Sequence, residues 1–287
     1  MRIDHLLDKG IGMMNEDAIV VTGGRFGVFD GASSVNSYVD EQGRTGGYLA
    51  SNIAKATFKT SASGLVETSL EANRRIGAAM AAKNIDTAQK ENTWCTTMAA
   101  VDVDIANREF EWAQIADSII LVINMDGTHQ GLIRDDYDHD RELMLRWKEM
   151  ADRRVDDIRS RLQSEIVELR RNANVKYGVL NGDPNAEKFL RTGSYLLEYV
   201  AHVLIFTDGM IPPKKDPTAA DDFSPIVKLF LEGGLPRIRD WIREIENGDP
   251  NCWEFPRYKK SDDIAAIAVS FGADSRIRRR PQDHTGA

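Results

Sequence analysis

The sequence predicts an α+β fold in which helices cover antiparallel sheet. Short strand-like segments follow one another closely in residues 18–29 and again in residues 95–124, a spacing typical of antiparallel sheet. Residues 46–58 and 65–88 lie between these regions and carry Ala, Leu, Ile and Met at spacings of three and four. That spacing predicts two amphipathic helices, which would cover a face of the sheet.

The composition indicates a globular chain with an acidic surface. The 287 residues suit one large domain or two small ones, and 42% hydrophobic residues can fill a core. A net charge of −8 would repel phosphate backbones, so no nucleic-acid partner is expected. We expect a cytoplasmic protein without a membrane segment, because the N-terminus carries acid and no apolar run approaches the roughly 20 residues a bilayer requires. Cys95 and Cys252 match no disulfide or zinc pattern and are predicted to be buried free thiols.

Turn residues divide the strand-rich regions into hairpins. Residues 18–21 and 26–29 flank the turn at 22–25, which predicts a first hairpin. The second region predicts a meander of strands at 95–105, 108–116 and 119–124. Asp126-Gly127, a strong hairpin signal, then leads to another short strand.

The second half of the chain mixes helices with two apolar strands. The predicted strands are 199–206, apolar throughout and so covered on both faces, and 264–271, with helices at 224–231 and 236–246 between them. Residues 141–171 predict a long charged helix or helix pair with an apolar stripe: Leu143, Trp147, Ala151, Val155, Ile158, Leu162, Ile166 and Leu169. The favoured interpretation is one domain over residues 1–275 with a helical insertion at about 140–172, and the alternative is a separate partner-binding helix. Residues 276–287 predict a disordered tail.

The first hairpin places two carboxylates opposite each other. A two-residue turn at Gly23-Gly24 pairs residues outward until Asp17 faces Asp30. Directly opposed side chains have Cβ atoms roughly 5 Å apart, and like charges there are destabilising unless a positive charge lies between them. Glu16 and the Gly31 carbonyl lie beside the pair and add hard oxygen ligands, which magnesium and manganese prefer.

Acids recur at other strand ends. Asp208 follows the apolar strand that ends at Thr207, and Asp262 and Asp263 precede the last strand. In antiparallel neighbours the end of one strand lies beside the start of the next, so these acids converge on one edge. Each acid alone is more simply a solvated strand end or turn residue, but together they predict a metal site.

Six short motifs occur in the order found in type 2C, or PPM, protein serine/threonine phosphatases, which the chain resembles over nearly its whole length. They are Asn15-Glu16-Asp17-Ala18, Val28-Phe29-Asp30-Gly31, Cys95-Thr96-Thr97, Ala116-Asp117-Ser118, Ile205-Phe206-Thr207-Asp208-Gly209 and Ser261-Asp262-Asp263-Ile264. The resemblance implies a four-layer α-β-β-α sandwich of two antiparallel sheets with a binuclear Mg²⁺/Mn²⁺ centre at one end. It also implies hydrolysis of phosphoserine and phosphothreonine in a protein substrate by a metal-activated water, without a phospho-enzyme.

The resemblance assigns roles by position. Asp30 looks like the carboxylate that bridges both metals. Asp30 and Asp208 are the two residues to which the resemblance assigns a catalytic role. The full ligand set carried over is Asp30, Asp208 and Asp262 for one ion, and Asp30, Glu16 and the Gly31 carbonyl for the other. Asp17 would support this set from outside the coordination sphere, and Asp117 resembles the ligand of a third, weaker metal. Asp263 stands where the family usually has Asn, so the choice between Asp262 and Asp263 stays open.

The chain departs from the family pattern at two functional positions. Gly12 stands where the family has its phosphate-binding Arg, and Ala32 stands where a His often follows Asp-Gly. Lys9, His5 or Arg44 could replace the missing cation, although the sequence places none of them at the site. Residues 33–44 also lengthen the connection beside the expected metals.

Other functions have weaker support. Asp30 is followed by Gly31-Ala32 rather than the x-Asp of haloacid-type phosphatases, and His139-Asp140 reads as solvated charge at a helix start rather than an HD-type site. P-loop, zinc-protease and GxSxG motifs do not occur. The main alternative is a pseudophosphatase of the same fold that acts as a regulatory or binding module, which Gly12 and Ala32 favour and the acids oppose. The oligomeric state is left open.

Overall fold

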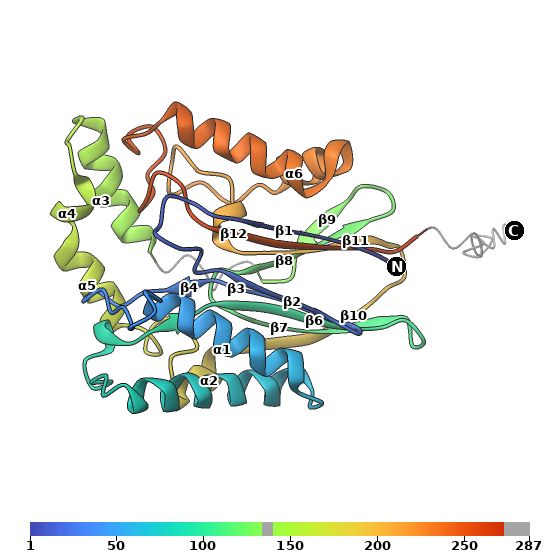
Figure 1. Ribbon diagram of the computed structural model, residues 1–287. Coiled ribbons are helices and arrows are strands. Elements are labelled where there is room, and N and C mark those ends of the chain that lie inside the picture. The colour runs from blue at the N-terminus through green and yellow to red at the C-terminus, as the bar shows by residue number, and fades with distance from the viewer. Residues whose placement is uncertain (134–139, 273–287) are drawn as a thin grey trace, which may run out of the picture.

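The computed structural model describes residues 1–133 and 140–272. Two five-stranded antiparallel sheets lie face to face, with α1 and α2 outside one and α6 outside the other (Figure 1). The predicted four-layer α-β-β-α sandwich is therefore confirmed. None of the described helices combines the length and the apolar composition that crossing a bilayer requires. His139 and residues 276–287, on which two of the predictions rest, lie outside the described residues.

The first sheet has the strand order β1-β12-β11-β8-β9. Its strands are β1 (Arg2–Asp8), β12 (Ile264–Ser270), β11 (Val200–Phe206), β8 (Ile119–Asn124) and β9 (His129–Gly131). Helix α6 (Ser224–Gly248) covers the outer face. Gly233 and Gly234 leave helical geometry and divide α6 at a kink, which agrees with the two helices predicted there.

The second sheet has the order β10-β7-β6-β3-β2. Its strands are β10 (Arg191–Leu196), β7 (Glu109–Ile115), β6 (Met98–Asp104), β3 (Arg25–Phe29) and β2 (Ala18–Thr22). The short strands β4 (Gly31–Ala32) and β5 (Cys95–Thr96) pair beside it. Helices α1 (Gly46–Thr60) and α2 (Leu65–Ala82) cover its outer face, and the 3-10 turns are η1 (Lys90–Asn92), η2 (Pro184–Phe189) and η3 (Asp208–Met210).

Three apolar layers hold the sandwich together. The central layer lies between the sheets and includes Phe26, Val28, Val203 and Ile267, all nearly inaccessible to solvent. Separate clusters lie beneath α1 and α2 and beneath α6. Because burying one large aliphatic side chain contributes about 1.5–3 kcal/mol, these layers make the sheets a rigid support for the loops at their ends.

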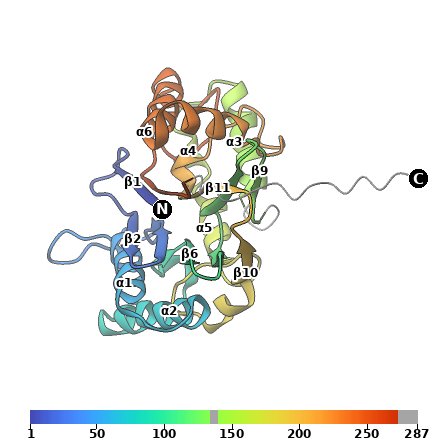
Figure 2. The same cartoon turned by 90° about the vertical axis from the view of Figure 1, so that its right-hand side faces the viewer.

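The helical segment lies at one end of the sandwich (Figures 1 and 2). It consists of α3 (Arg141–Asp152), α4 (Ile158–Arg161) and α5 (Gln163–Arg171) rather than the predicted long helix or helix pair. Its apolar stripe forms a cluster with Cys252, Trp253 and Tyr258 from the loop that follows α6. The Trp147 Nε1–H donates to the Cys252 carbonyl at 3.1 Å, and the Trp253 Nε1–H donates to the Val155 carbonyl at 2.9 Å. The segment is therefore packed on the loop between α6 and β12.

Candidate metal centre

The predicted hairpin register is the one the structure has. Ile19 pairs with Val28 and Val21 with Phe26, so Asp17 and Asp30 follow at the open end of the β2–β3 hairpin. The Asp30 carbonyl is held by the Thr97 N–H at 2.9 Å. The structure therefore brings these two acids to one end of the second sheet, beside β5.

Thr207 ties the acids of the two sheets together. Its Oγ1–H donates to Asp17 Oδ2 at 2.7 Å, and its Oγ1 accepts from the Ala265 N–H at 2.9 Å. This one hydroxyl links the start of β2, the end of β11 and the start of β12. Asp208 follows Thr207 directly, so Asp208 lies at the same end of the sandwich as Asp17 and Asp30.

The acids raise one another's pKa values. Burial, and then the charges of Asp117 and Asp262, raise the pKa of Asp30 to about 7, and Lys259 opposes this. Burial followed by the charge of Asp30 raises the pKa of Asp208 well above its usual range, and the same two causes raise that of Asp17. Carboxyls whose pKa values rise in this way are buried and lie close to other negative charges.

Asp117 joins this group from the β7–β8 connection. Its charge acts on both Asp30 and Asp208. Its Oδ1 is buried and has no hydrogen-bond donor among the described residues. A buried carboxylate oxygen without a donor is costly unless another positive group contacts it, which a cation does.

The backbone before Asp117 is strained. Ala116 has φ of +60°, in the left-handed region that residues with a Cβ rarely adopt. We expect Ala116→Gly to change the free energy of unfolding by less than about 1 kcal/mol, since relieved strain offsets the greater chain entropy and the lost methyl burial. Ala116→Val should cost at least about 2 kcal/mol, because a β-branched side chain fits this conformation poorly. Urea denaturation of both variants measures this, and equal stabilities would show that the backbone relaxes freely.

The structure distinguishes Asp262 from Asp263. Asp263 Oδ1 accepts from the Gly10 N–H at 2.8 Å and its Oδ2 accepts from the Glu16 N–H at 2.7 Å, so this buried side chain holds the β1–β2 loop. Asp262 acts through its charge on Asp30 and Asp208 as well as on Asp17, on which Asp263 also acts. Asp262 also keeps an oxygen, Oδ2, without a donor among the described residues, whereas Asp263 supports the backbone of Glu16.

Glu16 and Gly31 lie against each other at the start of α1. A Cβ on Gly31 would lie 2.3 Å from the Gly47 carbonyl oxygen and 2.5 Å from that of Glu16, so only glycine fits there. The Glu16 carboxylate accepts from the hydroxyls of Ser33 and Thr45 through the same oxygen, Oε1. Its other oxygen, Oε2, has no such donor among the described residues.

The residues present are chemically suited to Mg²⁺ or Mn²⁺. Both ions prefer carboxylate and carbonyl oxygens, which are the groups gathered here. Within residues 1–133 and 140–272, no three Asp, Glu, His or Cys side chains are drawn together as a ready-made coordination cage. The assignment of these acids to one candidate metal centre therefore rests on three observations. The acids converge at one end of the sandwich, the pKa values of Asp17, Asp30 and Asp208 are raised, and Oδ1 of Asp117 has no donor among the described residues.

The cations proposed from sequence lie elsewhere, whereas Lys259 lies at the acids. Arg44 is bound to Asp40 of its own loop at 2.7 Å, His5 is exposed in the middle of β1, and Lys9 is exposed in the β1–β2 connection. Lys259 forms an ion pair with Asp262, and its charge acts on Asp30 and Asp208. No motif marks Lys259 in the sequence, since it stands in an irregular stretch between α6 and β12.

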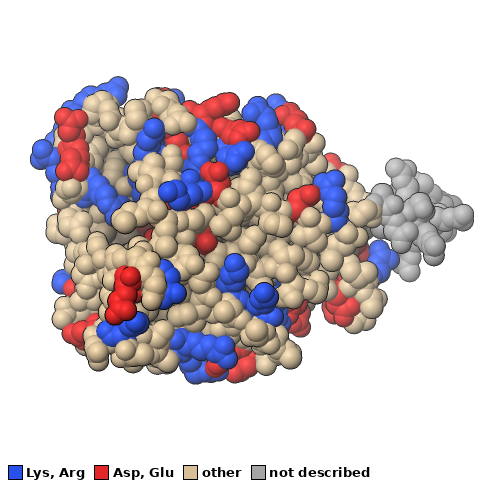
Figure 3. Space-filling model, in the orientation of Figure 1, with Lys and Arg blue, Asp and Glu red and all other residues tan. Residues whose placement is uncertain are grey.

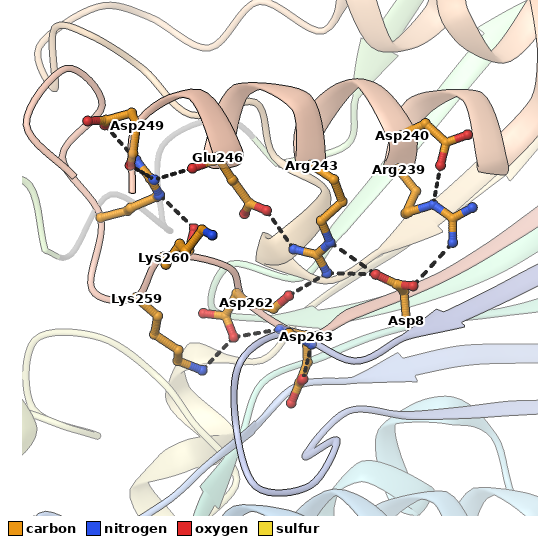
Figure 4. Close-up of polar contacts among 12 residues, drawn as sticks. Asp8, Arg239, Asp240, Arg243, Glu246, Asp249, Lys259, Lys260, Asp262 and Asp263 are labelled. Atoms are coloured by element: carbon orange, nitrogen blue, oxygen red, sulfur yellow. Dashed lines mark hydrogen bonds and ion pairs between the residues drawn. The ribbon is translucent and has the colours of Figure 1, made fainter. Parts of the chain in front are cut away.

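An arginine on α6 holds the backbone of Asp262 (Figure 4). Arg243 Nη2 donates to the Asp262 carbonyl at 2.7 Å and to Asp8 Oδ2 at 2.9 Å. Its Nη1 donates to Glu246 Oε2 at 2.7 Å, and Glu246 is 3% exposed. The loop that carries Asp262 is thus fixed to both α6 and β1.

Arg243→Met is expected to lower the free energy of unfolding by about 3–5 kcal/mol, because it leaves the buried Glu246 without its cation. Arg239→Met is the matched control, since Arg239 also pairs with Asp8 but is more exposed. That change should cost about 1 kcal/mol or less. Urea denaturation tests the contrast, and equal losses would show that the Glu246 pair contributes nothing special.

The fold matches solved structures closely in extent and weakly in sequence. The catalytic domain of the serine/threonine protein phosphatase PstP, in complex with two manganese ions, is 16% identical with a TM-score of 0.55, covering 94% of this chain and 97% of that chain. The phosphatase MsPP from Mycobacterium smegmatis, in complex with cacodylate, is 18% identical with a TM-score of 0.55, covering 95% and 99%. Stp1 from Staphylococcus aureus is 16% identical with a TM-score of 0.57, covering 94% of each chain.

The sequence comparison identifies the family. No curated protein sequence matches this chain at a significant level. The Protein phosphatase 2C family profile matches residues 10–244, which is most of the chain and spans the acids from Glu16 to Asp208. The chain belongs to the protein phosphatase 2C, or PPM, family.

Proposed function

We propose that this chain is a metal-dependent phosphatase that hydrolyses phosphoserine and phosphothreonine in proteins. The observation that carries the proposal is the convergence of Asp30, Asp208, Asp262 and Asp117 from four loops onto one end of the sandwich, where burial and the charges of the neighbouring acids raise the pKa values of Asp30 and Asp208. A regulatory scaffold has no need to keep carboxylates that destabilise one another. The fold, shared with a phosphatase whose structure contains two manganese ions, supports the same reaction class.

Two Mg²⁺ or Mn²⁺ ions would be held by the carboxylates of Asp30, Asp208, Asp262 and Glu16 and by the Gly31 carbonyl, with a weaker third ion at Asp117. Such ions supply a water with a pKa near 7 and neutralise charge on phosphoryl oxygens. Asp263 is not needed as a ligand, because the Gly10 and Glu16 backbones occupy both of its oxygens.

The protein's own groups would set the position of the acids. Thr207 holds Oδ2 of Asp17, which fixes this carboxyl beside that of Asp30. The Thr97 N–H and the Arg243 guanidinium hold the backbone carbonyls of Asp30 and Asp262. Ala32 provides no proton donor, so loss of the leaving group would depend on water, which costs about 10²–10⁴ in rate against a positioned acid.

The face of the molecule drawn in Figure 3 offers no simple rule for substrate choice. Acidic and basic side chains are interspersed on the face in Figure 3, with no large area of one sign. Recognition of a phosphoprotein would therefore depend on the metal centre and the loops around it, including residues 33–44.

Release of phosphate from a phosphoserine or phosphothreonine peptide, and from p-nitrophenyl phosphate, tests the proposal. We expect turnover with Mn²⁺ that a chelator abolishes and re-added Mn²⁺ restores. Absence of Mn²⁺-dependent turnover in a preparation that calorimetry shows to bind Mn²⁺ would refute it. That outcome would support the pseudophosphatase, which Gly12 and Ala32 favour.

A further inference from the structure

The loop that carries Lys259 has a rigid backbone. Arg257, two residues before it, donates to Asp249 Oδ2 at 2.9 Å, to the Phe255 carbonyl at 2.7 Å and to the Lys260 carbonyl at 3.0 Å. Figure 4 labels two of these partners, Asp249 and Lys260, near the end of α6. Lys259 therefore extends from a fixed point rather than from a loose loop.

The helical segment also supports this loop. Arg159 Nη1 on α4 donates to the Tyr258 carbonyl at 3.1 Å, directly before Lys259. Tyr258 packs edge-to-face on Trp147 of α3, with ring centroids 6.1 Å apart. Lys259 thus emerges where the helical segment, α6 and the acids meet.

The ammonium of Lys259 faces the acids, and only some of its N–H donors form hydrogen bonds with them. Its Nζ donates to Asp262 Oδ1, while its charge acts on Asp30 and Asp208. An ammonium has three N–H donors, and Asp262 is its one hydrogen-bond partner among the described residues. The side chain is 37% exposed, so the remaining donors can reach a bound group.

The pairing leaves Asp262 able to act as a ligand. Its Oδ1 accepts from Lys259 and from the Asp263 N–H, whereas its Oδ2 has no donor among the described residues. One oxygen of Asp262 can therefore contact a cation while the other holds Lys259 beside it. A phosphoryl group bound at such a cation would lie within reach of the ammonium.

We propose that Lys259 is the cation that binds the substrate's phosphoryl group in this protein. The inference rests on the proposed function. Lys259 would supply the positive charge that Gly12, a residue without a side chain in an exposed bend, cannot supply. A lysine is a flexible point charge with rotatable donors, whereas an arginine presents a planar fork. Phosphate recognition here is therefore less demanding in orientation than recognition by a bidentate guanidinium.

Calorimetric binding of inorganic phosphate to the Mn²⁺-loaded protein tests the role of Lys259 without requiring turnover. Lys259→Met and Lys259→Gln should each raise the phosphate Kd at least about tenfold, because a charge-assisted hydrogen bond is lost. Lys259→Arg should keep the Kd within about threefold of wild type. Lys260→Met is the matched control, with the same charge change at the adjacent residue, and should leave the Kd unchanged.

Two results would overturn the assignment: an unchanged phosphate Kd in the neutral variants, or an equal loss of phosphate affinity in Lys260→Met. An unchanged phosphate Kd together with tighter Mn²⁺ binding in the neutral variants would make Lys259 a counter-ion of the carboxylates only. The KM for p-nitrophenyl phosphate should rise in parallel with the phosphate Kd. If wild-type protein binds phosphate but hydrolyses nothing, the proposed function fails while the calorimetry still decides the role of Lys259.

Discussion

Asp30→Asn is expected to lower Mn²⁺-dependent phosphate release by about 10³-fold or more and, at the same time, to stabilise the metal-free protein. The loss follows because the charge of Asp30 acts on both Asp17 and Asp208, and in the proposed function Asp30 would be the carboxylate shared by two ions. Metal charge stabilises the transition state by several kcal/mol, and about 4 kcal/mol corresponds to 10³ in rate. The gain in stability follows because Asn removes a negative charge from a repelling group.

Asp152→Asn is the matched control, since Asp152 is an exposed acid on α3 paired with Lys148. That variant should retain wild-type turnover and stability. Initial rates at saturating Mn²⁺ and melting temperatures in chelator give the two readouts. An Asp30→Asn variant with turnover within tenfold of wild type would exclude Asp30 as the bridging ligand.

The positions of the acids could be predicted because they depend on local rules. A two-residue turn sets the hairpin register, so Asp17 and Asp30 could be paired from the sequence alone, and the structure has that register. The strand-end position of Asp208 follows from the continuous apolar run of β11, which is buried between neighbours on both sides. A buried strand can be recognised from the sequence because its own side chains form an apolar run.

Two of the four edge strands of the five-stranded sheets, β1 and β10, could not be predicted, for the opposite reason. Both β1 and β10 pair with only one neighbouring strand and keep exposed or half-exposed side chains along their length. They are strands because their backbones pair with β12 and β7. Since their side chains are not buried on one face, the sequence shows little alternation of apolar and polar residues. The predicted helix 65–88 was also too long, since α2 ends at Ala82 and Asn84 adopts φ of +56°.

The finer features of the site depend on contacts between distant residues. Asp262 and Asp263 are adjacent residues of the same type, so the sequence cannot distinguish their roles. They differ in the fold because the Gly10 and Glu16 N–H groups donate hydrogen bonds to the two carboxylate oxygens of Asp263. Lys259 likewise has no motif, and it lies at the acids only because Arg257 and the helical segment fix its loop. Such assignments require the folded chain.

The metal-free protein is expected to lose stability between about pH 4 and pH 7 and to recover it when Mn²⁺ is added. The pKa of Asp30 is raised to about 7 in the folded state from a usual value of 3.8, and those of Asp17 and Asp208 are raised as well. A carboxyl with a raised pKa contributes stability that is complete below its unfolded pKa and is lost as pH rises through its folded pKa. A destabilisation on the order of 2 kcal/mol, from burial and repulsion together, corresponds to a fall of about 3 °C in the melting temperature of a chain of this length.

Other groups titrate in this range, so Asp30→Asn serves as the reference. The pKa of His202 is lowered by burial, which makes its contribution rise with pH, opposite in sign to that of the acids. The difference between wild type and Asp30→Asn isolates the carboxyl contribution, because both proteins keep His202. The melting temperature of metal-free Asp30→Asn should therefore decline less with pH.

Saturating Mn²⁺ should stabilise the protein more at pH 8 than at pH 5, because protons and cations compete for the same carboxylates. At 100 times the Kd, a ligand that binds only the folded state adds about 2.7 kcal/mol, enough to offset the repulsion that remains at high pH. Melting temperatures with Mn²⁺ and with chelator at the two pH values measure this. A stabilisation independent of pH would mean that the cation binds away from the acids, whereas a pH-dependent one that disappears in Asp30→Asn places it among them.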